Sequence, residues 1–188
     1  PLTRLRNQLE NTLMSVDNDE AREQAGKAVA EADQLLATFN ALLRIARLET
    51  RGNTADMQQV PLGELVSDAC ELYEALAEDK EQQFEQSLED HVVIEGDRDL
   101  LFQMVSNLID NAIKYSGDQV KVGVEIARLG ARRVGISVRD QGVGITRHEL
   151  KRVFRRFYRL PAALRSRVRG TGLGLSIVRA VARRHGGR

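Results

Sequence analysis

The first fifty residues show helical periodicity only, and this repeat limits the possible folds more than any other feature. Apolar side chains recur every three or four positions between Leu2 and Val16, which places them on one face of a helix. An acidic turn at 17–20 follows, and a second apolar stripe continues to Glu49. Two helices joined by a short turn form an antiparallel hairpin that buries little surface alone. We therefore expect two hairpins to associate into a dimeric four-helix bundle.

The pattern changes at the loop Arg51–Thr54, which predicts a hairpin domain at 1–52 and a second domain at 53–188. Expected strands lie at 57–60, 92–94, 120–126 and 134–138, and expected helices at 61–80, 97–116 and 174–185. The last two strands alternate in hydropathy on either side of Gly130, which predicts an antiparallel pair. This mixture of elements indicates an α+β fold, a two-layer α/β sandwich, rather than a doubly wound sheet.

Composition excludes several kinds of protein. Lys and Arg number 28 against 27 Asp and Glu, so the chain lacks the excess of positive charge that is typical of nucleic-acid-binding proteins. The single Cys70 excludes an internal disulfide framework, and we expect it to face the core from a helix. No apolar run approaches the roughly 20 residues that cross a bilayer.

Two asparagines lie one helical turn apart in the expected helix 97–116. Asn107 and Asn111 share a face, and Lys114 follows three positions later on the same side. Carboxamide oxygens suit Mg²⁺, which keeps waters and shares phosphate oxygens, and a lysine supplies positive charge for phosphates. Taken alone, the pattern fits an ordinary amphipathic helix equally well.

Two glycine-containing motifs follow. Asp140-Gln-Gly142-Val-Gly144 comes directly after the last expected strand, where a carboxylate can accept a hydrogen bond from adenine's exocyclic amine and glycines admit a flat ligand. The loop 170–174 leads into a helix, so its backbone amides can bind an anion. It is not a Walker loop, because no Lys-Ser or Lys-Thr follows. Taken alone, the first motif could be a simple turn that closes a strand, and the second could be a flexible hinge.

Between these motifs lies a long basic segment, 146–169, which also holds Phe154 and Phe157. A loop of this length in a compact domain is usually functional, and we expect a lid over a polyphosphate. A nucleic-acid patch is the alternative, and the near-zero overall charge argues against it. The basic residues of the segment are Arg147, Lys151, Arg152, Arg155, Arg156, Arg159, Arg165, Arg167 and Arg169.

Together and in this order, the asparagine motif, the two glycine motifs and Phe154-x-x-Phe157 resemble the sensor histidine kinase family of bacterial two-component systems. The resemblance spans essentially the whole chain. Pro1-Leu2-Thr3 is similar to the end of the family's histidine box, and 42–49 to the end of its second hairpin helix. The family resemblance implies the two-layer sandwich fold that sensor histidine kinases share with type II topoisomerase and mismatch-repair ATPases.

The resemblance also implies ATP and Mg²⁺ as ligands, with Asn111 binding the metal and Asp140 holding the adenine amino group. Asn107 and Lys114 are the implied catalytic residues. Further ATP contacts are implied as well. Tyr115 and Arg159 contact the phosphates, and Gly142 and Gly144 shape the adenine pocket. Phe154 and Phe157 anchor the lid, and the lid closes through Gly170, Thr171, Gly172, Leu173 and Gly174.

The implied reaction transfers the γ-phosphoryl group of ATP to a histidine on the hairpin and then to an aspartate of a response regulator receiver domain. The related ATPases carry a water-activating Glu four residues before the metal-binding Asn. Asn107 stands there in this chain and cannot act as a base, so transfer is favoured over hydrolysis. The implied partners are a second copy, through the hairpin, and the receiver domain. Nucleic acid is not expected, and the parent protein is expected to be membrane-anchored with this part in the cytoplasm.

Two departures from the family pattern accompany the resemblance. The phosphoacceptor histidine is expected five residues before Pro1, and none of His91, His148 and His185 matches its motif, so we expect this chain not to phosphorylate itself. His185-Gly-Gly is similar to the family's turn after the last helix, where a further strand normally follows; we expect the domain at 53–188 to lack this final strand, which leaves one sheet edge open. A catalytically inactive dimerisation and interaction module of the same fold is the alternative function.

Overall fold

A computed structural model of the protein describes residues 19–49, 57–89, 91–161, 163 and 170–188. The chain divides into two compact units, Pro1–Thr50 and Arg51–Arg188. In the first unit, helix α2 spans Asp19–Glu49 without a break, as the second apolar stripe predicted. The expected first hairpin helix lies outside the described residues, so the hairpin and its bundle stay predictions. Within the described ranges, no helix is both long and apolar enough to span a bilayer.

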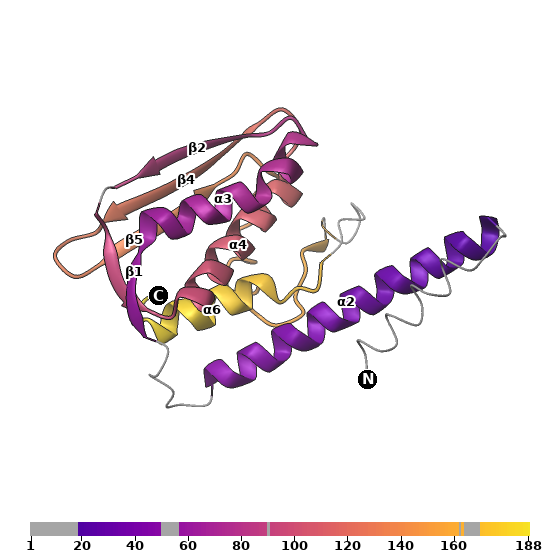
Figure 1. The fold of residues 1–188 in the computed structure, drawn as a ribbon, viewed down its shortest axis with the longest axis horizontal. Coiled ribbons are helices and arrows are strands. Elements are labelled where there is room, and N and C mark those ends of the chain that lie inside the picture. Colours follow the sequence, from indigo (N-terminus) through magenta and orange to yellow (C-terminus); the bar gives the residue numbers. More distant parts are fainter. Residues whose placement is uncertain (1–18, 50–56, 90, 162, 164–169) are drawn as a thin grey trace. The chain divides into compact units, whose positions relative to one another are not determined.

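The second unit is an α+β sandwich in which α3, α4 and α6 cover one face of a sheet (Figure 1). The expected strands and helices of this unit are confirmed to within a few residues. The elements are β1 (Gln58–Pro61), α3 (Leu62–Glu78), β2 (Gln83–Leu88), β3 (Val93–Gly96), α4 (Arg98–Tyr115), β4 (Lys121–Arg128), β5 (Val134–Arg139) and α6 (Gly174–Arg184).

The main sheet has the order β2-β4-β5. The β4–β5 pair is antiparallel, as predicted, with Ile126 opposite Ile136. Strand β2 pairs with β4 in parallel and was not predicted from the sequence. Its segment Gln83–Leu88 contains no β-branched residue, so local propensity gives little signal, and the strand depends on pairing with β4. The strands β1 and β3 form a separate antiparallel ribbon.

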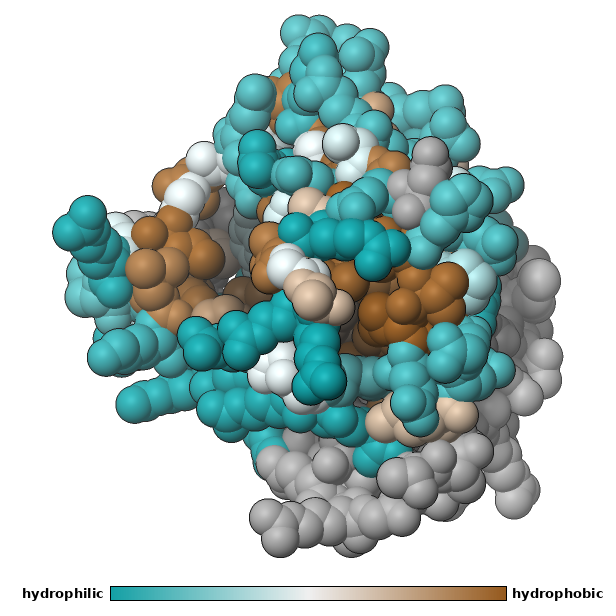
Figure 2. All heavy atoms as spheres, turned by 90° about the vertical axis from the view of Figure 1, so that its left-hand side faces the viewer, coloured by the Kyte–Doolittle hydropathy of each residue, from teal (hydrophilic) through white to brown (hydrophobic). Residues whose placement is uncertain are grey.

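The residues of strand β4 show that one face of the sheet is buried and the other is exposed to solvent. Val122, Val124 and Ile126 are buried and point toward the helices, since alternate residues of a strand face the same side. The intervening Glu125 forms an ion pair with Arg139 of β5 on the opposite face. A sheet covered by helices on one side only explains this alternation. Viewed from the left of Figure 1, where the β4–β5 loop projects, apolar patches lie among polar side chains (Figure 2).

Helix α4 begins at a cap and is joined there to the end of α6. The carboxylate of Asp97 accepts a hydrogen bond from N of Leu100 (3.1 Å), which caps the first turn. Nε2 of His185 accepts a hydrogen bond from N of Asp97 (3.0 Å), and Nδ1 of the same ring lies 2.8 Å from O of Val181. The end of α6 therefore lies at the start of α4, and α6 runs antiparallel to α4.

Candidate functional site

The antiparallel packing brings the start of α6 to the two asparagines of α4. A β-carbon at Gly174 would lie 3.1 Å from Oδ1 of Asn107 and 3.6 Å from Nδ2 of Asn111. Nδ2 of Asn107 donates to O of Gln103 (2.8 Å), which fixes the amide so that its oxygen faces α6. The first and last predicted motifs thus meet, and a side chain at position 174 would crowd the amide of Asn107.

The turn at 140–144 lies against the end of α4. A β-carbon at Gly142 would overlap the carbonyl oxygen of Tyr115, so this position requires glycine. Oδ1 of Asp140 accepts a hydrogen bond from N of Gly142 (2.8 Å), which shapes the turn and leaves the exposed carboxylate with further lone pairs. Gly144 has a φ of +67°, a conformation that glycine adopts without strain.

The N-terminus of α6 has no side-chain cap. Its N-cap residue, Leu173, makes no capping hydrogen bond, and its own N donates to Oγ1 of Thr171 at 3.3 Å. The first amides of a helix have no partner within the helix, and the macrodipole makes this end favourable for anions. Gly172 (φ +72°) packs on the backbone of Phe157, and a β-carbon at Gly170 would lie 3.9 Å from the Tyr115 hydroxyl.

From Thr146 to Tyr158 the basic segment runs through successive turns rather than a regular helix. Phe154 lies 5.8 Å, ring centroid to guanidinium, from Arg179 of α6, which attaches this part of the segment to the helix. Phe157, in contrast, is 56% exposed and has a φ of +61°. Nη2 of Arg159 donates to O of Ala163 at 3.3 Å. Three expected basic residues, Arg165, Arg167 and Arg169, lie outside the described residues.

A second set of contacts orders this segment near its start. The hydroxyl of Tyr158 donates to Oε1 of Glu149 (2.7 Å), and Arg152 lies 5.0 Å from the centre of the Tyr158 ring. The hydrogen bond to Glu149 is the main cause that raises the pKa of Tyr158 above its ordinary value. These contacts, and that of Arg179 with Phe154, were not expected from the sequence. They join side chains across irregular backbone, which has no regular spacing that could predict them.

Lys114 forms an ion pair that was not predicted from the sequence. Its Nζ lies 2.7 Å from Oδ2 of Asp110, one helical turn earlier, and both side chains are partly exposed. The i, i+4 spacing of acid and base on a helix was the signal that could have revealed the pair. An ammonium carries three donors, so this bond leaves two for other acceptors.

The site thus consists of two carboxamides, an uncapped helix N-terminus, an aspartate-containing turn and a basic segment. In the described part of the chain, no group of three or more His, Cys, Asp or Glu could hold a metal ion. The amide pair beside Gly174 fits Mg²⁺, because this ion keeps several waters and takes phosphate oxygens as ligands. The arrangement is suited to an anionic ligand with a flat polar group.

Comparison with known proteins identifies the class of this domain. Residues 96–188 match the family described as histidine kinase-, DNA gyrase B-, and HSP90-like ATPase. The sensor-like histidine kinase SenX3 of Mycolicibacterium smegmatis is 33% identical over 171 residues, covering 91% of this chain and 44% of that protein. Sensor protein QseC of Escherichia coli K12 is 33% identical over 189 residues, covering 99% of this chain and 40% of that protein.

A solved structure gives the same result. The mycobacterial sensor histidine kinase MprB superimposes with a TM-score of 0.62 at 30% identity, covering 69% of this chain and 80% of that one. The chain belongs to the sensor histidine kinase family and contains its catalytic ATPase-type domain. It spans less than half the length of the curated relatives SenX3 and QseC.

Proposed function

We propose that the chain binds Mg-ATP between α4, the turn 140–144 and the start of α6, as the kinase core of a two-component system. The γ-phosphoryl group passes to a histidine on the helical hairpin, and from there to an aspartate of a response regulator receiver domain. The observation that supports this most is the contact of Gly174 with Asn107 and Asn111. It brings anion-binding amides and metal-suited carboxamides to one place.

Asn111 supplies the protein ligand to Mg²⁺ in this proposal, and the phosphates lie at the uncapped amides of α6. The metal, when bound, neutralises charge on the β- and γ-phosphate oxygens. Asp140 accepts a hydrogen bond from the adenine amino group, while a guanine carbonyl at the same place would be repelled. Gly142 and Gly144 shape the adenine pocket, since a side chain at 142 would displace the turn from α4.

Lys114, Tyr115 and Arg159 contact the phosphate chain. Lys114 keeps one hydrogen bond to Asp110 and turns its remaining donors to the phosphates. Phe154, held beside Arg179, anchors the lid, and Phe157 packs on Gly172 at its other end. The residues that close on the triphosphate are Gly170, Thr171, Gly172, Leu173 and Gly174.

Asn107 favours transfer over hydrolysis. A carboxamide does not accept a proton from water near neutral pH, and its Nδ2 already donates to O of Gln103. Catalysis then depends on positioning and on neutralising phosphate charge, which is the usual division of work in phosphoryl transfer. The histidine on the hairpin provides the nucleophile.

We also propose that residues 1–52 form a dimerisation and phosphotransfer hairpin and 53–188 the ATP-binding domain. On α2, Leu35, Phe39 and Leu43 follow one another at intervals of four and are 59%, 49% and 42% exposed. Such a stripe is suited to a second copy in a four-helix bundle. The parent protein is proposed to be membrane-anchored, with this part in the cytoplasm.

Titration with a fluorescent ATP analogue tests the site. Asp140→Asn and Asn111→Ala each remove one charged or metal-mediated contact, so we expect affinity to fall about 10-fold to 100-fold. Asp68→Asn is the matched control, because Asp68 is exposed and pairs with Arg98 on α3 and α4. Unchanged binding in both site variants would show that the nucleotide does not bind as assigned.

Transfer is tested by mixing the chain with a histidine-bearing hairpin fragment and γ-labelled ATP. We expect the fragment to acquire label and the 188-residue chain itself to stay unlabelled, since His91, His148 and His185 lie outside the family's histidine motif. Nucleotide binding without any labelled fragment would instead favour an inactive interaction module.

A further inference from the structure

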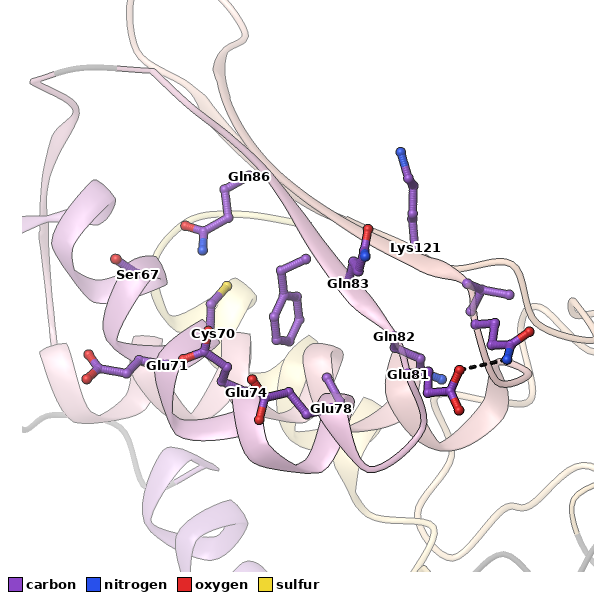
Figure 3. A pocket seen from close by; sticks show the side chains of 14 residues that line it. Ser67, Cys70, Glu71, Glu74, Glu78, Glu81, Gln82, Gln83, Gln86 and Lys121 are labelled. Carbon is purple, nitrogen blue, oxygen red and sulfur yellow. Dashed lines mark hydrogen bonds between the residues drawn. The ribbon is translucent and has the colours of Figure 1, made fainter.

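A second concave surface lies away from the proposed nucleotide site, between α3 and β2. It encloses about 1010 Å³ and is lined by side chains of both elements and of the neighbouring β4. Figure 3 shows Glu71, Glu74 and Glu78 along α3, with Gln83 and Gln86 on β2 across from them. We call this surface the α3–β2 groove. None of the residues that it draws from α3 and β2 takes part in the proposed kinase reaction.

The groove carries uncompensated negative charge. Four carboxylates line it (Glu71, Glu74, Glu78 and Glu81), against one cation, Lys121, which already pairs with Glu85. In the parts of the chain that the structure covers, the side-chain carboxylates of Glu71, Glu74 and Glu78 have no hydrogen bond or ion pair. Other carboxylates of the same domain, such as Asp68, Glu89 and Glu125, are paired with arginines. A cationic partner would therefore pair with the groove carboxylates that have no partner within the domain.

A buried acceptor at the end of the groove adds a second observation. Gln82 lines the groove and is only 4% exposed. Its Nε2 donates to O of Gly117 (2.7 Å) and O of Ile113 (3.3 Å), which fixes the orientation of the amide. Among the described residues, its Oε1 has no hydrogen-bond partner. An unsatisfied buried acceptor is unfavourable, so a donor entering from the groove would be stabilising there.

The other wall of the groove is a sheet edge. Within the described strands, β2 is the outer strand of the sheet, and N of Gln83 donates to O of Val120 on the β4 side. Successive residues of a strand direct their backbone groups to opposite sides, so Phe84, Gln86 and Leu88 direct theirs to the open edge. Such an edge accepts an added strand through main-chain hydrogen bonds.

We propose that the α3–β2 groove docks an extended, lysine- or arginine-rich segment of a partner protein. The segment pairs with the open edge of β2 and directs alternate basic side chains to the carboxylates of α3. Glu71, Glu74 and Glu78 recur roughly every 5 Å along the helix, and alternate residues of a strand recur about every 6.6 Å. Long basic side chains bridge this difference. The free backbone edge favours a peptide over a small polycation, which has no main chain to pair.

Fluorescence anisotropy with the 188-residue chain tests the proposal. The probe is a labelled nine-residue peptide of alternating lysine and threonine. Glu74→Gln/Glu78→Gln removes two groove carboxylates without changing helix propensity much, and we expect binding to weaken about five-fold or more. The matched control, Glu31→Gln/Glu95→Gln, removes the same charge from exposed sites elsewhere and should bind within about two-fold of the parent chain. Urea unfolding and nucleotide titration check that both variants fold.

A second peptide, N-methylated at alternate residues, tests strand pairing. Methylation removes main-chain donors but no charge, so we expect at least about a ten-fold loss if two or more strand hydrogen bonds form. Equal loss in groove and control variants, or absence of binding at millimolar peptide, would overturn the proposal. So would equal binding of the methylated peptide or of spermine, since either would mean a site for polycations. Self-association of the chain that Glu74→Gln/Glu78→Gln abolishes would mean a second copy as occupant.

Discussion

Gly174→Ala separates the role of this position in ligand binding from its role in folding. The residue begins α6 with a negative φ, so alanine is compatible with its backbone and its helix propensity favours folding by up to about 1 kcal/mol. The new β-carbon would lie 3.1 Å from Oδ1 of Asn107, a few tenths of an ångström inside ordinary contact. The amide of Asn107 must then move, which lengthens its 2.8 Å bond to O of Gln103. We expect these two effects on the free energy of unfolding to cancel within about 1 kcal/mol.

Nucleotide binding should respond differently, because the shifted amide and the added methyl group lie where the phosphates are proposed to bind. Partial loss of one charge-assisted hydrogen bond, about 1 kcal/mol, weakens affinity about five-fold. Fluorescent nucleotide titration and urea denaturation measure the two quantities on the same samples. Gly63→Ala is the matched control, since Gly63 lies in the first turn of α3 with open space around its Cα. Equal nucleotide affinity in Gly174→Ala and Gly63→Ala would refute the reasoning.

Three further variants or reagents test the packing. His185→Ala should lower the free energy of unfolding by about 1–2 kcal/mol in urea, because the partly buried N–H of Asp97 at the start of α4 loses its acceptor, whereas exposed His148→Ala should change it little. Gly142→Ala should lower it by about 1–3 kcal/mol, because the methyl overlaps a backbone carbonyl; an unaltered urea midpoint would contradict this. Burial raises the pKa of Cys70 from 9.0 to about 11, so at pH 8 its thiolate fraction is roughly 100-fold lower than in the unfolded chain. Its reaction with a disulfide reagent should be slower by at least that factor until urea unfolds the protein.

The sequence predicts the elements with strong local signals. Alternation of apolar residues around Gly130 predicted the β4–β5 pair, and the expected helix 97–116 begins within a residue of α4, which Asp97 caps. Strand β2 has neither signal, because Gln83–Leu88 becomes a strand through its pairing with β4. Local patterns predict a strand only when its own residues favour that conformation, and here the favourable interactions are non-local.

Site residues could be chosen from the sequence, but their mutual arrangement could not. The spacing of Asn107 and Asn111 placed both on one helical face, and the glycine motif at 170–174 marked a helix start. Nothing local predicts that Gly174 lies against those amides, since the contact follows from α6 running antiparallel to α4. Asp110 is the opposite case, because its spacing of four residues from Lys114 is a local signal that predicts their ion pair.

The two ends of α6 are held by different means, and this difference links stability to ligand binding. At its C-terminal end, His185 joins the helix to the start of α4 within the protein itself. At its N-terminal end, no side chain caps the first turn, and glycines leave the amides accessible. A bound anion would act as the missing cap, and any ligand that binds only the folded state raises its stability with concentration. The proposed nucleotide would therefore complete the first turn of α6 and, through Phe154 and Arg179, order the basic segment that precedes it.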